Sequence, residues 1–475
     1  MLTYQDLLLV GEDEKSRAAF VRRVIDEHKS SDMYMTACTA EDYATGRNTT
    51  IMRHKKMLAT VTGQMVEDRY SANHKTASNF FEILVTQLNQ YLLGNGATWK
   101  GATPKQFGED FDNKLQKAGE EALKGGVSFG MFNLDHIDVF SIREFAPIYD
   151  EEDGSLKSGV RFWQIDSTKP LRATLYEMDG YTNYMWTSRK EASEGWMVIE
   201  DGIYKRDKQN YVLKTITSVA DGTKVYDGAN YPTFPVVPLW GNPKHQSELV
   251  GLREKIDAYD FIQNGFENDL DNAQIYWIIK GAGGMDDPDL MRFLDRLRTV
   301  GAAAPADGQE VAPVAVNIPY EAREKLLDRV ERQMYKDSMI MNPDDIAAGA
   351  ATATQIRAAY ERQNVKTDRF EYGVLDFIKG LSNVAGVKSK ASFSRSAVVN
   401  TQEEITTVVA SATYLDPEYV TRKILTLLGD GDQADEMIKK MTEEEAERNL
   451  GGDGDNDDTE GQATNQNADE ESEQQ

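Results

Sequence analysis

The side chains best suited to catalysis or metal binding are few and scattered in this sequence. The five histidines follow no spacing typical of a metal site, such as His-Glu-x-x-His. The only cysteine is Cys38, so the chain can form neither an intramolecular disulfide nor a thiolate zinc site. We expect surface or hydrogen-bonded roles for the histidines, and a small apolar packing role for Cys38. The histidines are His28, His54, His74, His136 and His245.

Three glycine-rich or acidic stretches resemble functional loops only in part. Residues 94–108, GNGATWKGATPKQFG, lack the Gly-Lys-Ser/Thr ending of a phosphate-binding loop. The stretch DGDNDD at 453–458 has Asp458 where a calcium loop needs glycine, and Thr464 where it needs a bidentate glutamate. No Gly-x-Ser-x-Gly nucleophile motif occurs. The sequence therefore predicts a protein that is not an enzyme and that binds no cofactor or metal.

The composition limits the classes of partner. A chain of 475 residues can bury a large core and normally forms more than one domain. No stretch reaches the roughly 18 apolar residues that a membrane span needs, so we expect a soluble protein without membrane contact. A net charge of −26 disfavours a tight, non-specific grip on nucleic acid through a basic face, although DNA could pass nearby. Residues 442–475 contain thirteen acids and one arginine, and we expect a disordered acidic tail over 448–475.

Hydrophobic periodicity predicts helices first and strands next. Residues 14–28, 79–93 and 108–125 have helical patterns, and glycines follow the last two. From about 127 to 240 the pattern alternates, with a hairpin turn at Asp179 and Gly180 and four of the six tryptophans. We expect a sheet packed on the helical first part.

The second half of the chain has mainly helical patterns. Residues 247–281 could form one long helix, with a rise of about 1.5 Å per residue. A glycine-bounded unit at 282–317 has one helical and one strand-like stretch, and helices are expected at 320–341 and 355–385. Between these two lies a run of small residues, Ile346–Thr354, which composition alone allows to be a simple flexible connector. Short helices are expected over 400–447.

Four stretches, in this order along the chain, resemble the portal proteins of tailed bacteriophages, most closely those of long-tailed phages of Gram-positive hosts. EDYATGRNTTI resembles an early Tyr-x-x-Gly element, with Tyr43 and Gly46, although Asp42 replaces a second tyrosine often found there. NFFEILVTQLNQYLLGNG is similar to a family helix, and FAPIYDEEDG to a family turn. The block around Ile256–Asp260 looks like the middle of the stem helix. The resemblance covers about residues 36–425.

The resemblance implies an α+β portal fold: a mixed α/β wing, long antiparallel stem helices, a small α/β clip and a helical crown, assembled as a cyclic ring, usually of twelve copies. Such a ring occupies one capsid vertex of the virion, after assembly in the host cytoplasm. Double-stranded DNA would pass through it without sequence specificity during packaging and ejection. The large terminase subunit, head-completion or adaptor proteins, and capsid and scaffolding proteins are the implied partners. The implied regions are an N-terminal extension (1–35), wing (36–240), stem helices (241–281 and 318–341), clip (282–317), tunnel loop (342–354), long wing or crown helix (355–385) and crown (386–447).

The resemblance also assigns candidate site residues. Lys280 and Arg323 could form thin positive rings in an otherwise acidic channel, although solvated or salt-bridged roles are favoured for them. The tunnel-loop residues expected to face DNA are Asn342, Asp344, Asp345, Ile346, Gly349, Ala350, Ala351, Thr352, Thr354 and Gln355. The clip residues expected to dock the motor are Gly283, Gly284, Asp286, Asp287, Asp289, Arg292, Asp295 and Arg296.

Two other classes stay open at this point. A packaging enzyme would need a phosphate loop or a carboxylate metal cluster, and the sequence has no clear example of either. A scaffolding or other capsid assembly protein without a channel would also be acidic and helical. It should lack the tryptophan-rich β region at 160–240, so that region discriminates against it.

Overall fold

The chain divides into two compact units, described separately below: residues 1–349 with 357–397, and residues 350–356 with 398–475. The computed structural model describes residues 2–59, 64–68, 72–100, 105–188, 195–217, 224–271, 276–280, 288, 292, 310–314, 320–343, 353–388, 390–396, 401–429 and 434–450.

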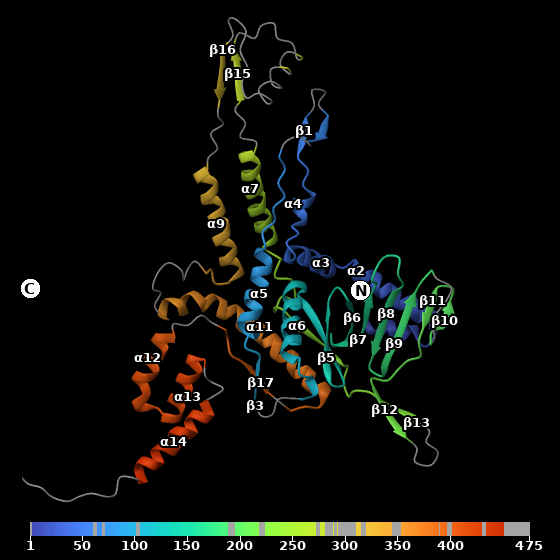
Figure 1. Ribbon diagram of the computed structural model, residues 1–475. Coiled ribbons are helices and arrows are strands. Elements are labelled where there is room, and N and C mark those ends of the chain that lie inside the picture. The colour runs from blue at the N-terminus through green and yellow to red at the C-terminus, as the bar shows by residue number, and fades with distance from the viewer. Residues whose placement is uncertain are drawn as a thin grey trace, which may run out of the picture. The chain divides into compact units, whose positions relative to one another are not determined.

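A six-stranded antiparallel sheet with two helices packed on it forms one core of the first unit (Figure 1). Its order is β10 (Met197–Glu200), β11 (Ile203–Lys205), β9 (Gly180–Trp186), β8 (Leu171–Glu177), β7 (Leu156–Trp163), β6 (Phe145–Tyr149). Leu7 of α1 (Tyr4–Val10) and Phe20 of α2 (Glu14–Lys29) join this core. The expected sheet on early helices is confirmed. Residues of the predicted extension, 1–35, share the sheet's core, and the predicted domain boundaries stay a prediction.

The turn between β8 and β9 lies one residue before the predicted one. Glu177 pairs with Gly180, so Met178 and Asp179 form the two-residue loop. Gly180 has φ +136°, and a Cβ there would lie 2.4 Å from the carbonyl oxygen of Gln209. Only glycine fits this position without strain.

A second core joins helices to a three-stranded sheet. The sheet has the order β14 (Val236–Trp240), β4 (Val127–Asn133), β5 (His136–Ser141). The long helix α11 (Ala353–Ala385) packs on β4, where a Cβ at Gly130 would lie 2.4 Å from the Phe377 ring. Three further helices complete this core: α3 (Asp32–Ala44), α5 (Phe80–Leu93) and α6 (Phe111–Gly125).

Four smaller elements and two hairpins lie around these cores. The elements are α4 (Thr49–Arg53), η1 (Lys105–Phe107), and β17 (Lys390–Phe393), which pairs with β3 (Ala97–Lys100). The hairpins are β1 (Met57–Ala59) with β2 (Met65–Glu67), and β12 (Val212–Thr217) with β13 (Lys224–Ala229). Residues 390–393 were expected in the crown, and their pairing with β3 places them in the first unit instead.

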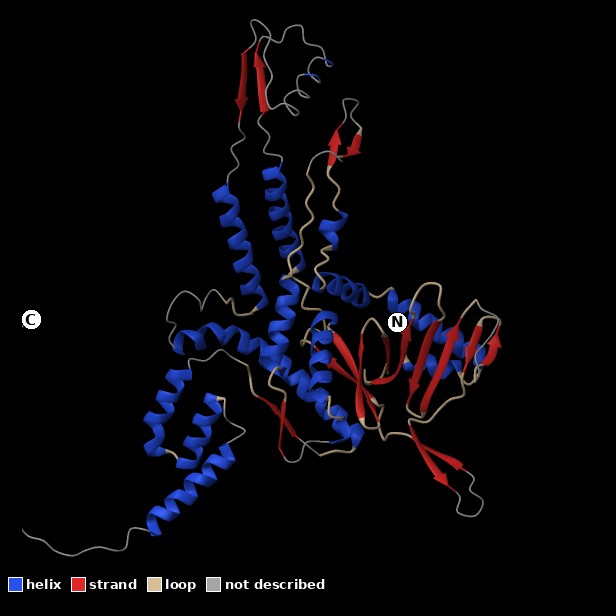
Figure 2. Cartoon of the chain, in the orientation of Figure 1, coloured by secondary structure: helices blue, strands red, loops and turns tan. Residues whose placement is uncertain are grey.

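Two helices, α7 (Arg253–Asp271) and α9 (Tyr320–Ser338), run side by side in Figure 2. The helix expected over 247–281 is therefore too long at both ends. It is followed by β15 (Tyr276–Lys280), which pairs with β16 (Glu310–Val314). Aromatic and β-branched residues, YWII, favour a strand at 276–279, and their apolar spacing fits either period.

The second unit contains three helices after its first residues: α12 (Thr401–Ser411), α13 (Pro417–Leu428) and α14 (Ala434–Leu450), with η2 (Ala412–Tyr414) between the first two. Asp416 accepts a hydrogen bond from the Tyr419 amide and caps α13, and Gly429 ends that helix with φ +94°. The short helices predicted for 400–447 are confirmed. The tail beyond Leu450 lies outside the described residues.

Candidate functional site

Helices α7 and α9 are antiparallel, and side-chain contacts join them toward both ends. The Lys255 ammonium lies 2.9 Å from the Asp337 carboxylate near one end. Toward the other end the Phe266 and Tyr320 rings meet edge-on, with centroids 5.7 Å apart. Because residue numbers rise on α7 as they fall on α9, the two helices form a hairpin-like pair.

The opposite face of α7 binds an extended segment, residues 74–78, through a ladder of side-chain acceptors. The Asp260 carboxylate accepts a hydrogen bond from the Ser78 amide at 3.0 Å. The Asn264 side-chain oxygen accepts one from the Thr76 amide at 2.7 Å, and Asn268 accepts one from the His74 amide at 2.7 Å. Phe266, which faces α9, lies two residues from Asn264 and Asn268, a rotation of about 200°. The ladder and α9 therefore occupy nearly opposite faces.

The ladder works because two different spacings match. Four residues of helix rise about 6.0 Å, and two residues of extended chain span about 6.7 Å. Asp260, Asn264 and Asn268 are four residues apart, and the amides they bind are two residues apart. Asn264 also donates to the Thr76 carbonyl at 2.8 Å, so its side-chain amide pairs with the chain as a neighbouring strand would. Main-chain groups of this segment thereby gain partners without a sheet.

At the start of this face, two stretches that the sequence analysis singled out meet. The Tyr43 hydroxyl donates to Asp257 at 2.5 Å and lies 3.0 Å from the Asn48 side-chain oxygen. Asn48 in turn donates to Asp260 at 2.7 Å. Gly46, with φ +72°, ends the same turn, and a Cβ there would lie 2.8 Å from the Asn79 side chain. The Tyr-x-x-Gly element and the Ile256–Asp260 run are thus parts of one buried polar cluster.

Burial decides the electrostatics of this junction. Desolvation raises the pKa of Asp260 above its ordinary value of 3.8, and the hydrogen bonds from Asn48 and Ser78 oppose that rise. The pKa of the Tyr43 hydroxyl is raised, by burial first and then by its hydrogen bond to Asp257. A neutral tyrosine donating to a carboxylate is the stable arrangement, and it suits a structural joint better than proton transfer.

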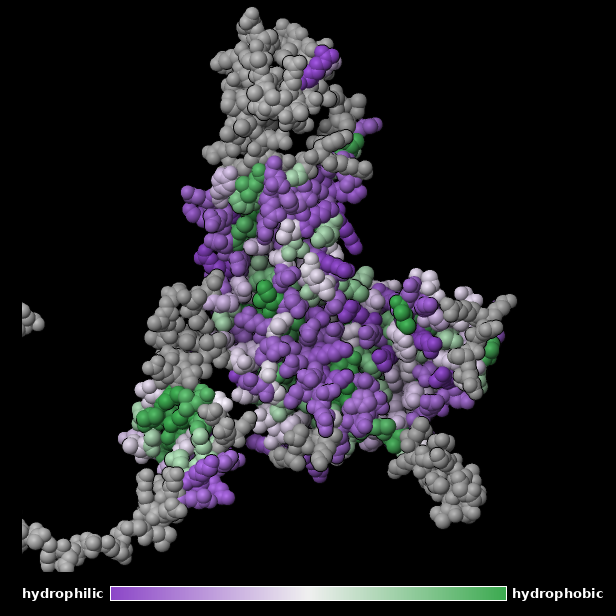
Figure 3. All heavy atoms as spheres, in the orientation of Figure 1, coloured by the Kyte–Doolittle hydropathy of each residue, from purple (hydrophilic) through white to green (hydrophobic). Residues whose placement is uncertain are grey.

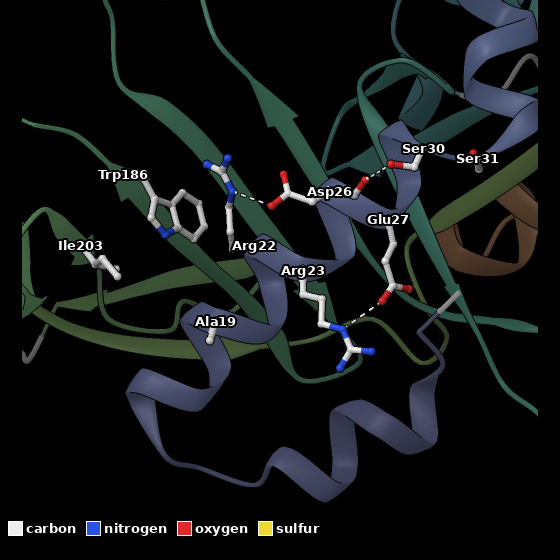
Figure 4. Close-up of a pocket in the computed structure, with 9 residues that line it drawn as sticks. All are labelled: Ala19, Arg22, Arg23, Asp26, Glu27, Ser30, Ser31, Trp186 and Ile203. Atoms are coloured by element: carbon white, nitrogen blue, oxygen red, sulfur yellow. Dashed lines mark hydrogen bonds and ion pairs between the residues drawn. The ribbon is translucent and has the colours of Figure 1, made fainter.

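A hollow of about 990 Å³ lies between α2 and the ends of β9 and β11 (Figure 4). Its charged residues pair with each other along the helix: Arg22 with Asp26 at 3.0 Å and Arg23 with Glu27 at 2.9 Å. Trp186 contributes an apolar wall. These pairs are exposed and four residues apart, which is typical of a solvated helix face.

The predicted roles of the histidines and the cysteine can be compared with their surroundings. His28 is buried, and its Nε2 lies 2.7 Å from the Ile142 carbonyl, as expected for a hydrogen-bonded histidine. Cys38 is half-buried, and burial raises the pKa of its thiol. Within the described ranges, no group of three or more His, Cys, Asp or Glu is arranged to hold a metal ion. No helix in the same ranges is long and apolar enough to cross a membrane.

Comparison with known proteins identifies the family. Residues 25–451 match the family described as "Phage portal protein, SPP1 Gp6-like". This chain is a member of the phage portal protein family. The portal protein of Clostridium phage phiCD119 is 23% identical over 387 residues, which cover 74% of this chain and 81% of the relative. The portal protein of Bacillus phage SPP1 is 20% identical over 374 residues, covering 74% and 69%.

Solved structures with a similar chain include two necks of gene transfer agent particles. One, from a native particle computed with C12 symmetry, is 13% identical, covers 72% of this chain and 89% of the neck chain, and has a TM-score of 0.43. The other, from an empty particle computed with C6 symmetry, is 13% identical, covers 74% and 90%, and has a TM-score of 0.42.

The family resemblance predicted from four stretches is therefore confirmed, and so is the portal, or connector, role. The family is one of structural phage proteins, and the scaffolding alternative does not agree with the match. The mixed helix and sheet architecture of the portal chain agrees with the predicted class.

The two candidate channel cations of this portal protein differ in their surroundings. Arg323 forms an ion pair with Asp269 at 2.5 Å, and its guanidinium lies 5.9 Å from the centre of the Phe266 ring. It joins α9 to α7, so the salt-bridged role favoured by the sequence agrees with this geometry. Lys280 ends β15, where it pairs in register with Glu310.

The predicted tunnel-loop residues lie mostly outside the described residues. Asn342 is 8% exposed, which disfavours a side chain that faces DNA, and its assignment to the tunnel loop stays a prediction. Just before it, the Met341 amide donates to Gln363 of α11, which holds the end of the α9 segment against the core. Thr354 and Gln355 belong to the first turn of α11. Asp344, Asp345, Ile346, Gly349, Ala350, Ala351 and Thr352 lie outside the described residues.

The predicted clip residues are also largely outside the described part of the chain. Arg292 is exposed. The other seven, Gly283, Gly284, Asp286, Asp287, Asp289, Asp295 and Arg296, are not among the described residues. Sequence reasoning missed Asn48 of the polar cluster and the ladder residues Asn264 and Asn268. The four-residue spacing of Asp260, Asn264 and Asn268 inside an otherwise amphipathic helix could have indicated them.

Proposed function

We propose that this portal protein assembles into a ring of twelve copies at one vertex of the capsid, and that double-stranded DNA passes through the ring. The single observation that carries this proposal is the antiparallel pair α7 and α9, because such a pair suits the wall of a channel when many copies stand side by side. Membership of the portal family supports it.

Residues 282–317 are proposed to be the clip that docks the large terminase subunit and later the head-completion or adaptor proteins. The hairpin of β15 and β16 supports this role, because it closes the end of the α7–α9 pair and carries the chain into the glycine-bounded unit. Capsid and scaffolding proteins are proposed to contact the outer parts of the ring during assembly in the host cytoplasm.

Residues 343–352 are proposed to form the tunnel loop that contacts passing DNA. Composition supports the role, because all nine residues at 346–354 are Ile, Ala, Gly or Thr. Side chains that are mostly small would permit twelve loops to crowd around one duplex. Buried Met341 and Asn342 would anchor the start of the loop.

Microscopy of the purified protein tests the ring. Negative-stain images should show rings with a central hole, and two-dimensional averages should give the number of copies. A chain that stays monomeric and compact at micromolar concentration would overturn the proposal. Deletion of 451–475 should leave the rings intact, because a segment so acidic and so poor in apolar side chains can bury little surface at an interface.

Bulky substitutions in the loop test its role in packaging. Gly349→Leu with Ala350→Leu should lower the amount of DNA packaged by roughly tenfold or more while ring formation is unchanged, since added side chains crowd the channel twelve times. Ala463→Leu, in the acidic tail, is the matched control and should package normally. Packaging at the unmodified level by the double variant would exclude the tunnel-loop role.

A further inference from the structure

Four cations form a stripe along one face of α9. Lys325, Arg329, Arg332 and Lys336 are separated by four, three and four residues, a spacing that places all of them on one side of a helix. All four are exposed. In Figure 3 the stem helices carry mainly hydrophilic surface, with apolar surface where α7 and α9 meet.

This cationic stripe faces away from α7. The contacts with α7 are made by Tyr320, Arg323 and Asp337. Lys325 lies two residues from Arg323, a rotation of about 200° along the helix. The stripe therefore lies on the side of α9 that the pair leaves uncovered.

The charges on α9 are separated by sign. Glu324, Asp328 and Glu331 are spaced by four and three residues and form an acidic row beside the stripe. The helix has five acidic and five basic residues, so its net charge is zero, yet from Lys325 to Lys336 one face carries only cations, with Glu321 one turn before them. A helix stabilised only by its own ion pairs has no need of such separation, because alternating signs serve that purpose.

Neighbouring acidic side chains neutralise the charge of the stripe only weakly. Lys325 lies 3.7 Å from Glu321, and Arg332 lies 3.8 Å from Asp328, with all four side chains more than half exposed. Exposed pairs of this length contribute little. Among the described residues, Arg329 and Lys336 form no ion pair. The stripe can therefore meet an external anion without first breaking a strong contact.

We propose that the stripe of Lys325, Arg329, Arg332 and Lys336 is a binding track for the phosphates of DNA in the channel. The inference rests on the proposed function. Eleven residues of helix cover about 16 Å, and phosphates repeat every 3.4 Å along each DNA strand, so one track spans about five phosphates. Flexible, hydrated cations of this kind hold a duplex in place laterally and exchange one phosphate for the next.

A channel wall that carries this track differs in charge from the wall that net charge alone predicts. A chain with net charge −26 predicts an acidic wall, and only Lys280 and Arg323 were expected to interrupt it. Arg323 is instead paired with Asp269. The exposed cations on the described helix α9 are these four, and they run along the helix instead of forming one thin ring.

Binding of a fluorescent 40-base-pair duplex to assembled rings of the full chain tests the track. The variant carries Lys325→Gln, Arg329→Gln, Arg332→Gln and Lys336→Gln. We expect affinity at about 100 mM salt to fall at least tenfold, and the slope of log Kd against log salt to fall by two or more, because each lost phosphate contact removes about 0.9 from that slope. The matched control, Glu324→Gln with Asp328→Gln and Glu331→Gln, should bind equally or more tightly.

The possible outcomes distinguish failure of the DNA-binding track from failure of the proposed ring. An unchanged salt slope in intact variant rings would overturn the track and leave the proposed channel standing. Loss of rings in the cation variant alone would also overturn it, because the stripe would then be a contact between copies. Absence of rings from the unmodified chain would overturn the proposed function itself.

Discussion

The two faces of α7 bind their neighbours through different kinds of contact. Toward α9 the contacts are an aromatic pair and ion pairs between half-exposed side chains. Toward residues 74–78 the contacts are hydrogen bonds from side chains to main-chain groups, and Asp260 and Asn264 are 1% and 4% exposed. Ion pairs between such side chains cost little to lose. A lost hydrogen bond on the second face costs more, because it leaves the buried side chain of Asp260 or Asn264 without a partner.

The difference indicates where the portal chain is rigid. Asp257, Asp260 and Asn264 connect α7 to Tyr43 and to the segment that enters α5. The junction of α7 with the core is thus fixed by a buried polar cluster, whereas salt weakens the ion pairs between α7 and α9. Four substitutions, ordered by expected effect, test this contrast.

Asp260→Ala should have the largest effect. It removes the acceptor for both Asn48 and Ser78, and two unsatisfied buried donors cost about 3 kcal/mol of the free energy of unfolding. Denaturation of the unassembled chain, followed by circular dichroism, measures the loss. Hydrogen exchange should also speed up at the Ser78 amide. Unchanged exchange at Ser78 would show that the ladder does not hold this segment.

Asp260→Asn is the matched control, and it also tests the effect of pH. Because burial raises the pKa of Asp260, the folded chain holds this proton more tightly than the unfolded chain. Its contribution to stability is present in full below pH 3.8 and is lost as pH rises through the raised pKa. The asparagine variant should lose less stability than the alanine variant and show a flatter pH dependence in that window.

Asn264→Ala should cost about 2 kcal/mol, because the Thr76 amide and carbonyl both lose their partner. Gln263→Ala is the control from the adjacent position, where the side chain reaches only Glu267 near the surface. Hydrogen exchange at Thr76 distinguishes them, and equal protection in both variants would contradict the strand-like role of Asn264.

Tyr43→Phe should cost about 1 kcal/mol. The ring stays buried, and the Asp257 carboxylate keeps its hydrogen bond from Thr50 at 2.9 Å. Tyr419→Phe, an exposed tyrosine of the second unit, should leave the thermal midpoint unchanged. A Tyr43→Phe variant as stable as the unmodified chain would mean that the junction does not depend on this hydroxyl.

The sequence predicted most elements whose periodicity is unambiguous. The spacing of apolar residues, and the glycines at the ends of elements, predict the helices at 14–29 and 111–125 and the hairpin of β8 and β9. The strand at 276–280 was missed, because a continuous apolar run such as YWII fits a helix or a strand, and its pairing partner lies more than thirty residues away.

The two parts of the junction could be predicted from the sequence, but the contact between them could not. Tyr43 and the Ile256–Asp260 run were both singled out, yet nothing in the sequence brings positions 214 residues apart into contact. The ladder was missed because Asp and Asn on a helix normally indicate a solvated face, and only the packed segment 74–78 turns them into buried acceptors.

Lys255→Gln should have the smallest effect, about 0.5 kcal/mol, because the ion pair with Asp337 is half-exposed and screened by salt. The hydrogen bond from Lys255 is the main reason that the pKa of Asp337 lies below its ordinary value of 3.8. The pair therefore stabilises the folded chain above that pH, and the contribution disappears as pH falls through the lowered pKa. A double-mutant cycle with Asp337→Asn, run in low and high salt, isolates the interaction. A coupling as large as the loss in Asp260→Ala, and insensitive to salt, would mean that both faces of α7 are equally rigid.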